Sequence, residues 1–235
     1  MPTARLAQTI RRSLLAISLT LLAGCNAETL FETNFNATPP GQPPAPAQPV
    51  GTAGVFGPPG SVVVAAGVDP TTTRWVQIGR ANNKVQIAGM LGTLSAFRGP
   101  GQYTFLCAMF MPSGSGLATI SFDPVGLQPG DLTNFLHLDF TTDNMVRLDD
   151  NDATKFGTFP RNQPFDVIVT LNTAASPATA HIALIGTGAS GSTDYTILSP
   201  FQPLAQQFDG VTVWMGYPWT GYFDATDLLV THNLN

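Results

Sequence analysis

Apolar and polar residues alternate with a period of two along much of the chain, which predicts β-strands rather than helices. In residues 165–171 the apolar side chains occupy every second position, so one face of that strand would be buried and the other exposed. Gly, Pro, Asn and Asp separate these runs and predict turns. The expected strands are residues 61–66, 74–78, 84–87, 101–111, 116–122, 135–141, 145–149, 165–172, 178–185, 195–198, 210–215 and 222–231.

Repeated short strands about 8–12 residues apart predict an antiparallel β-sandwich or barrel. Residues 29–36 alternate in the same way and could add an edge strand. The proline-rich residues 38–50 are expected to lie along the surface as an extended segment of the same domain. One helical turn is expected over 203–208, where Leu204, Ala205 and Phe208 share a face.

Composition narrows the class of protein. Charged residues make up 11% of the chain, against about 25% in an average domain. Lys and Glu, both strong helix formers, occur only at Lys84, Lys155, Glu28 and Glu32. The formal net charge of −5 gives no electrostatic attraction to nucleic acid, so a nucleic-acid partner is not expected.

The N-terminus has the pattern of an export signal. Arg5, Arg11 and Arg12 precede an apolar run at 13–22, which is too short to cross a bilayer. The next residues, Leu-Ala-Gly-Cys at 22–25, resemble the lipobox of bacterial lipoproteins. The alternative is an ordinary secretory signal that happens to contain a cysteine.

The lipobox resemblance implies that residues 1–24 are removed and that Cys25 becomes the lipidated first residue. The mature chain, 25–235, would then be a single domain held at a membrane by its acyl chains. Asn26 follows the cysteine, where Asp would favour retention at the inner membrane. The resemblance therefore implies a cell-envelope protein anchored at the outer membrane.

Three passages of the mature chain resemble the concanavalin-A-like lectin/glucanase jelly roll: residues 30–35, 135–170 and 221–231. They match the first strand of that family, a run of consecutive strands in its middle, and its terminal strand. The resemblance implies an all-β antiparallel sandwich in which the last strand pairs beside the first. Other β-sandwiches share such patterns of burial and remain alternatives.

The carboxylates needed for glycoside hydrolysis are missing from the expected strands. Glycosidases of this fold use a pair of carboxylates flanking the sugar bond, commonly as Glu-x-Asp-x-Glu on one strand. The only glutamates, Glu28 and Glu32, lie near the N-terminal tether. We therefore expect a protein that is not an enzyme, unless distant side chains such as Asp139 and Asp166 converge in a cleft.

An aromatic cluster is the strongest candidate for a binding site. Trp214, Tyr217, Trp219 and Tyr222 lie within nine residues that Gly and Pro interrupt. Flat aromatic rings with a polar edge are suited to stacking on sugars, which predicts a glycan site. The alternative is that these side chains fill the core and close one end of the sandwich.

A second candidate site is acidic. Asp149, Asp150 and Asp152 form the densest group of carboxylates, and Asp143 and Asn144 could contribute further oxygen ligands. Oxygen ligands on a tight loop suit Ca²⁺. The same residues are common in hairpin turns, and the spacing is not that of an EF-hand.

The other residues with possible metal or nucleophile chemistry stand apart in the sequence. His137, His181 and His232 are never paired as in a zinc motif, although His137 and Asp139 share one strand face. Once Cys25 is lipidated, Cys107 has no cysteine to pair with, and it is expected to be a buried, inert thiol.

These observations lead to two hypotheses of function. The first is a lipid-anchored, non-enzymatic β-sandwich of the cell envelope that binds carbohydrate. The second is a structural or protein-binding outer-membrane lipoprotein without a small ligand. Exposure of Trp219 beside a groove would favour the first, and its burial would favour the second.

Overall fold

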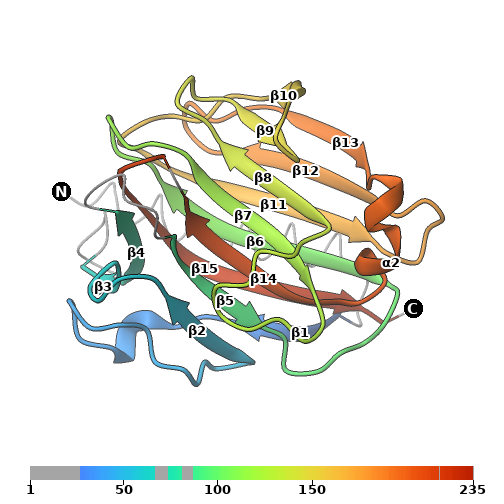
Figure 1. Ribbon diagram of the computed structural model, residues 1–235, viewed down its shortest axis with the longest axis horizontal. Coiled ribbons are helices and arrows are strands. Elements are labelled where there is room, and N and C mark those ends of the chain that lie inside the picture. Colours follow the sequence, from blue (N-terminus) through green and yellow to red (C-terminus); the bar gives the residue numbers. More distant parts are fainter. Residues whose placement is uncertain (1–26, 67–73, 81–86, 217, 235) are drawn as a thin grey trace, which may run out of the picture.

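A computed structural model describes residues 27–66, 74–80, 87–216 and 218–234. In this part of the chain two antiparallel β-sheets pack face to face (Figure 1). The first sheet runs in the order β13 (Ser192–Thr196), β12 (Thr179–Ile185), β11 (Pro164–Asn172), β6 (Gln102–Phe110), β15 (Gly221–Asn233), β4 (Trp75–Arg80) and β3 (Val62–Ala65), with β1 (Ala27–Glu32) also paired to β15. The second runs β10 (Asn151–Phe156), β9 (Val146–Leu148), β8 (Leu136–Phe140), β7 (Ala118–Pro124), β14 (Phe208–Met215), β5 (Ala88–Thr93) and β2 (Thr52–Phe56).

The predicted antiparallel sandwich is thus confirmed, and most expected strands coincide with observed ones to within a few residues. The first and last strands pair, with Ala27 opposite Asn233 and Glu32 opposite Leu229. The expected helical turn is present as a short 3₁₀ turn, Ser199–Phe201, followed by α2, Gln202–Ala205. Phe208, expected in that turn, instead begins β14.

Three strands were not predicted, and the prediction was wrong there for identifiable reasons. β5 has two glycines in six residues and β2 has one in five, and glycine disfavours strands. The glycines of β5 are nevertheless required by the packing around them. A Cβ on Gly89 would lie 2.5 Å from the Phe56 ring, and a Cβ on Gly92 would lie 2.4 Å from the Phe31 ring. β10 is a polar edge strand without a buried face. The expected strand 84–87 falls largely outside the described residues, and only Ile87 is described, just before β5.

The core lies between the sheets, where most strands contribute their alternate apolar residues. Aromatic rings interlock across this space: Phe105 on the first sheet meets Phe122 on the second edge-to-face, with ring centroids 5.4 Å apart. Tyr103 and Phe208 make a similar contact at 4.9 Å. Edge-to-face pairs contribute about 0.5–1.5 kcal/mol beyond the area that they bury. Cys107 lies in the same core and is fully buried, as expected.

The proline-rich segment lies on the surface, as expected. Most of segment 38–50 is exposed, and it is hydrogen-bonded to neighbouring strands, with Gly41 N donating to Val64 O at 2.8 Å and Ala53 N to Pro46 O at 2.8 Å. No helix within the described ranges is long and apolar enough to cross a membrane.

Candidate functional site

The outer face of the second sheet carries a row of functional side chains across four strands. Trp214 on β14 lies opposite Thr119 on β7, which lies opposite Asp139 on β8, which lies opposite Arg147 on β9. Each residue is flanked along its strand by inward-facing apolar neighbours, so alternation alone sends all four side chains outward. With a strand spacing of about 4.8 Å, the row spans about 14 Å.

A groove of about 520 Å³ lies over this row. Its volume falls within the range of about 300–1,000 Å³ typical of small-molecule sites. Residues of the β7–β8 connection and of the turn before β14 form its sides. The described lining residues are Leu117, Thr119, Leu132, Thr133, Asn134, His137, Asp139, Arg147, Asp150, Phe201, Leu204, Trp214, Gly216 and Trp219.

Two tryptophans form one end of the groove. Trp214 lies against two glycines, because a Cβ on Gly89 would be 2.6 Å from its Cβ and one on Gly216 would be 2.6 Å from its ring. Trp219 lies over Gly116, where an added Cβ would be 2.5 Å from the Trp219 Cβ. Both tryptophans are half-buried. Trp219 is therefore a groove residue with an accessible surface, and it also packs against the core.

A buried arginine holds the loop that carries Trp219. The guanidinium of Arg80, at the end of β4, donates to the carbonyl oxygens of Gly216 at 2.8 Å and Trp219 at 2.7 Å. The Trp219 amide closes the same turn by donating to Gly216 O at 3.1 Å. The position of Trp219 thus depends on a cation from the opposite sheet.

Charged residues form the other end of the groove. Asp139, only 2% exposed, accepts a hydrogen bond from Thr119 at 2.8 Å and two from Arg147, from Nε at 3.1 Å and Nη2 at 2.8 Å. Burial raises the pKa of Asp139 above its ordinary value, against the opposing effect of the Arg147 hydrogen bonds. For Arg147, burial lowers the pKa, but the hydrogen bond and charge of Asp139 and those of the neighbouring carboxylates outweigh it, so the pKa is raised overall.

The acidic residues 149–152 form a hairpin turn beside this end. Asp149 and Asp150 have φ angles of +49° and +56°, and Leu148 pairs with Asn151 across them. Two central residues with positive φ define a tight hairpin turn, for which Asp and Asn are suited. The Asp149 carboxylate has structural partners, because it accepts hydrogen bonds from the His137 amide at 2.9 Å and from the Tyr195 hydroxyl at 2.8 Å.

The residues that could together bind a cation are not the ones expected from the sequence. Among the described residues, His137, Asp139 and Asp150 bring ligand atoms within 4.8 Å of one another, whereas Asp149 and Asp152 do not join them. The Arg147 guanidinium lies among these carboxylates, donating to Asp150 at 2.9 Å and to Asp152 at 3.4 Å as well as to Asp139. Asp143 is also occupied, by Lys155 at 3.0 Å.

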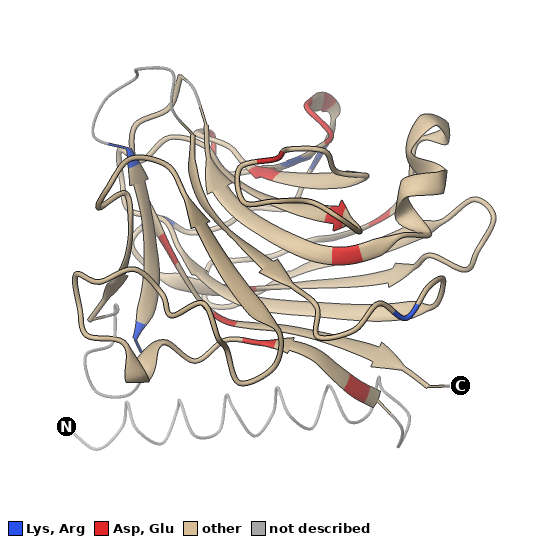
Figure 2. Cartoon of the chain, turned by 60° about the horizontal axis from the view of Figure 1, so that its bottom comes forward, with Lys and Arg blue, Asp and Glu red and all other residues tan. Residues whose placement is uncertain are grey.

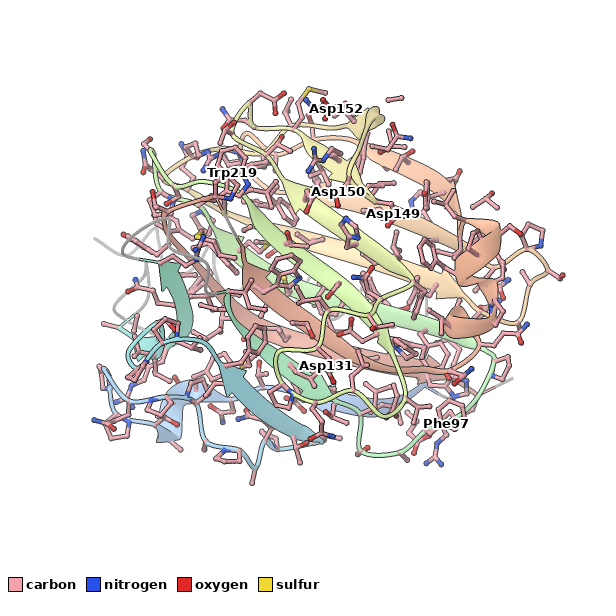
Figure 3. All side chains as sticks on the ribbon, in the orientation of Figure 1. Phe97, Asp131, Asp149, Asp150, Asp152 and Trp219 are labelled. Atoms are coloured by element: carbon pink, nitrogen blue, oxygen red, sulfur yellow. The ribbon has the colours of Figure 1, made fainter. Side chains whose placement is uncertain are left out.

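The predicted aromatic cluster divides in space. Trp214 and Trp219 line the groove, whereas Tyr222 lies on β15 of the first sheet, on the side opposite the core-facing Phe223. Tyr217 and Cys25 lie outside the described residues. Figure 3 shows Trp219 and Asp150 on the same side of the second sheet, although the sequence separates them widely.

Other candidate residues do not converge on the groove. Asp166 is on β11 of the first sheet, so it and Asp139 lie on opposite outer faces of the sandwich. His181 contacts the exposed Asp194 at 2.7 Å, and His232 stacks on Tyr103 with centroids 4.7 Å apart. Burial raises the pKa of the Cys107 thiol well above its ordinary value, which makes it a poor nucleophile.

Sequence reasoning missed several groove residues. Arg147 alternates with the buried Val146 and Leu148, so its outward direction could have been predicted, but its partners could not. Asn134, which contacts His137 Nδ1 at 3.2 Å, lies in a connection with no periodic pattern. Phe201 and Leu204 resemble ordinary helical-turn residues until the fold places them over the sheet.

A second polar cluster lies on the same outer face. Asp123 is 1% exposed and accepts a hydrogen bond from the Thr212 hydroxyl at 2.6 Å. Its other oxygen and the Ser121 hydroxyl have no hydrogen-bond partner among the described residues. Burial raises the pKa of Asp123 to about 7, with the hydrogen bond from Thr212 opposing the shift.

Comparison with known proteins identifies the fold. No protein-family model matches the sequence, and no curated protein matches it. Lectin II from Ulex europaeus superposes with a TM-score of 0.54 at 13% identity, covering 88% of this chain and 98% of that one. Arcelin-5, a lectin-like defense protein from Phaseolus vulgaris, gives 0.54 at 9% identity, covering 90% and 100%. The VIP36 exoplasmic/lumenal domain, in its Ca²⁺-bound form, gives 0.52 at 10% identity, covering 88% and 90%.

The fold is therefore the concanavalin-A-like jelly roll, as the sequence resemblance predicts. At these levels of identity the likeness shows the fold and does not carry over residues or ligands.

Proposed function

We propose that this chain is a carbohydrate-binding protein that holds a glycan in the groove of the second sheet without cleaving it. The observation that carries the proposal is the two-sided groove, with Trp214 and Trp219 at one end and His137, Asp139 and Asp150 at the other. A sugar has an apolar C–H face and a rim of hydroxyl groups. Aromatic rings bind such a face, and the polar end can bind the rim.

Structures with the same fold support the proposal. An Ulex lectin with a TM-score of 0.53 to this chain is described as complexed with galactose. The VIP36 domain is described in a Ca²⁺/Man3GlcNAc-bound form, at a TM-score of 0.50. We propose the same class of ligand here, because the fold recurs together with a groove of suitable size and lining.

The bonding of Asp139 supports binding rather than hydrolysis. Asp139 and Asp150 are close enough for a pair of catalytic carboxylates, which in retaining glycosidases lie about 5 Å apart. Both oxygens of Asp139 are already occupied, however, one by Thr119 and the other by Arg147. These bonds hold the carboxylate in place, and its 2% exposure keeps it beneath the groove surface, which disfavours its attack on a sugar.

A thermal-shift screen against neutral oligosaccharides tests the proposal, followed by calorimetry on any sugar that stabilises the protein. A ligand that binds only the folded state must raise the melting temperature, and the rise must grow with the ligand concentration. We expect Trp219→Ala to weaken binding at least tenfold, and Tyr222→Ala, on the other sheet, to leave it unchanged. Chromatography of the sugar after incubation would reveal cleavage.

Two outcomes would contradict this function. Shortened oligosaccharides would show that the protein is a hydrolase. No thermal shift with any sugar at millimolar concentration would exclude the glycan site and favour a structural or protein-binding role.

We propose further that the domain is held at the cell envelope, in the outer membrane, by lipid on Cys25. The support is the basic, apolar and Leu-Ala-Gly-Cys pattern of residues 1–25. Two or three acyl chains anchor a protein stably, whereas one binds reversibly. Growth with labelled palmitate should mark the full chain in the membrane fraction, and Cys25→Ser should lose both the label and the membrane association. A labelled Cys25→Ser chain would contradict the anchor.

A further inference from the structure

We propose that the groove selects neutral and amino sugars and rejects acidic ones, and that Asp150 is the residue that sets this preference. The inference rests on the proposed function, because it specifies the class of sugar bound at the same site.

The described lining of the groove has a single Lys or Arg side chain, Arg147, and carboxylates already pair with it. Each guanidinium nitrogen donates to a carboxylate: Nε to Asp139, Nη2 to Asp139 and Asp150, and Nη1 to Asp152. These bonds use four of the five N–H groups, so a sugar carboxylate could bind Arg147 with two hydrogen bonds only by displacing one of these partners.

Negative charge surrounds the same end of the groove. Over residues 137–155 the chain has five carboxylates, at Asp139, Asp143, Asp149, Asp150 and Asp152, against two cations, Arg147 and Lys155. Lys155 contacts two of these acids, at 3.0 Å and 3.4 Å. Figure 2 shows acidic residues, in red, spread over the strands and turns of the molecule, with few basic residues, in blue, between them. An acidic sugar that enters the groove would therefore be repelled by these carboxylates.

Asp150 is the carboxylate placed to meet a ligand. Its side chain is 75% exposed, whereas Asp139 is buried beneath it. One oxygen accepts from Arg147 at 2.9 Å, and the other faces His137 Nε2 at 3.4 Å. Such an oxygen can accept from a sugar hydroxyl, or more strongly from the ammonium of an amino sugar.

The charge of Asp150 distinguishes the groups that a ligand can present to it. A hydroxyl or an ammonium group can donate a hydrogen bond to this carboxylate. A sugar carboxylate can accept a hydrogen bond but cannot donate one, so it gains no hydrogen bond from Asp150 and is repelled by its charge.

Sugars that share a backbone but differ in charge test the inference on the whole protein. The probes are N-acetylchitohexaose and its deacetylated form, and lactose, N-acetyllactosamine and their sialylated forms, on one array. For any backbone that binds, we expect the acidic form to bind at least tenfold more weakly at low salt, and the difference to shrink in 0.5 M salt. Deacetylated sugar should bind at least as well as the acetylated form.

Asp150→Asn should reduce this discrimination at least threefold, while Asp194→Asn, on the first sheet, should leave it unchanged. Asn tolerates the positive φ of position 150 and can still accept from Arg147, so the variant should fold. Equal or tighter binding of the acidic form would overturn the selectivity and leave carbohydrate binding intact. Binding of no backbone in any form would overturn both proposals.

Discussion

Arg80 donates a hydrogen bond of 2.7 Å to the carbonyl oxygen of Trp219. A residue at the end of a strand in the first sheet therefore fixes a residue that lines the groove over the second sheet. The arginine is 6% exposed, and the same nitrogen also contacts Gly216 O. Two carbonyl groups of one turn therefore depend on a single buried side chain.

Replacing Arg80 should loosen that turn. Arg80→Met leaves the carbonyls of Gly216 and Trp219 without their charged donor, and a hydrogen bond to a charged group contributes about 1.5–3 kcal/mol. We expect the free energy of unfolding to fall by about 3 kcal/mol and sugar affinity to fall in the folded variant. Urea titration and calorimetry would measure the two effects. Arg98→Gln, which removes an exposed ion pair, is the control and should change neither the free energy of unfolding nor the sugar affinity by much. An unchanged sugar affinity in Arg80→Met would contradict the role of Arg80 in positioning Trp219.

Gly116 provides a more local test of Trp219. An added Cβ would lie 2.5 Å from the Trp219 Cβ, so Gly116→Ala should displace the indole from the groove. We expect weaker sugar binding together with a red shift in tryptophan fluorescence. Gly114→Ser, in the same loop and with open space around the Cβ position, is a steric control, although its φ of +83° makes it somewhat strained. Unaltered binding in Gly116→Ala would show that the indole position is unimportant.

Arg147 should govern how the protein responds to calcium. Its removal leaves Asp139 and Asp150 without their guanidinium partner, and breaking a buried ion pair such as Arg147–Asp139 costs about 3 kcal/mol or more. We expect Arg147→Gln to melt at a lower temperature and to be restabilised by millimolar Ca²⁺ more than the unmodified protein is. Equal calcium shifts in the two proteins, measured by calorimetry, would contradict this competition between guanidinium and cation.

Asp123 should make stability fall as the pH rises. Its pKa is about 7 in the folded protein and 3.8 for an ordinary Asp, so folding favours its protonated form. The stabilising contribution is complete below pH 4 and is lost as the pH rises through 7. At 1.36 kcal/mol per pKa unit the loss approaches about 4 kcal/mol.

Asp123→Asn should therefore be more stable than the unmodified protein at pH 8, and the advantage should shrink toward pH 4. Urea titrations across this range would measure it. The matched control is Asp131→Asn, which alters an exposed carboxyl in the connection after β7 and should show no such trend. A constant difference between Asp123→Asn and the unmodified protein at all pH values would rule out titration of Asp123.

The sequence by itself determined most of the strands and the class of fold. Alternation in segments such as 165–171 is a local property, because successive side chains of a strand point to opposite faces. It also marked Trp214 and Trp219 as candidates. It failed at β5, where glycines are required by the rings of Phe31 and Phe56, which lie elsewhere in the chain.

Which residues share the site follows from the tertiary structure. Strand pairing places Thr119, Asp139 and Arg147, from three consecutive strands, in one row with Trp214, which lies far from them in the sequence. The fold also places Tyr222 on the other sheet. It places Arg147 among the carboxylates that the sequence suggested as calcium ligands. Such contacts arise from long-range register, which a one-dimensional pattern of polar and apolar residues does not contain.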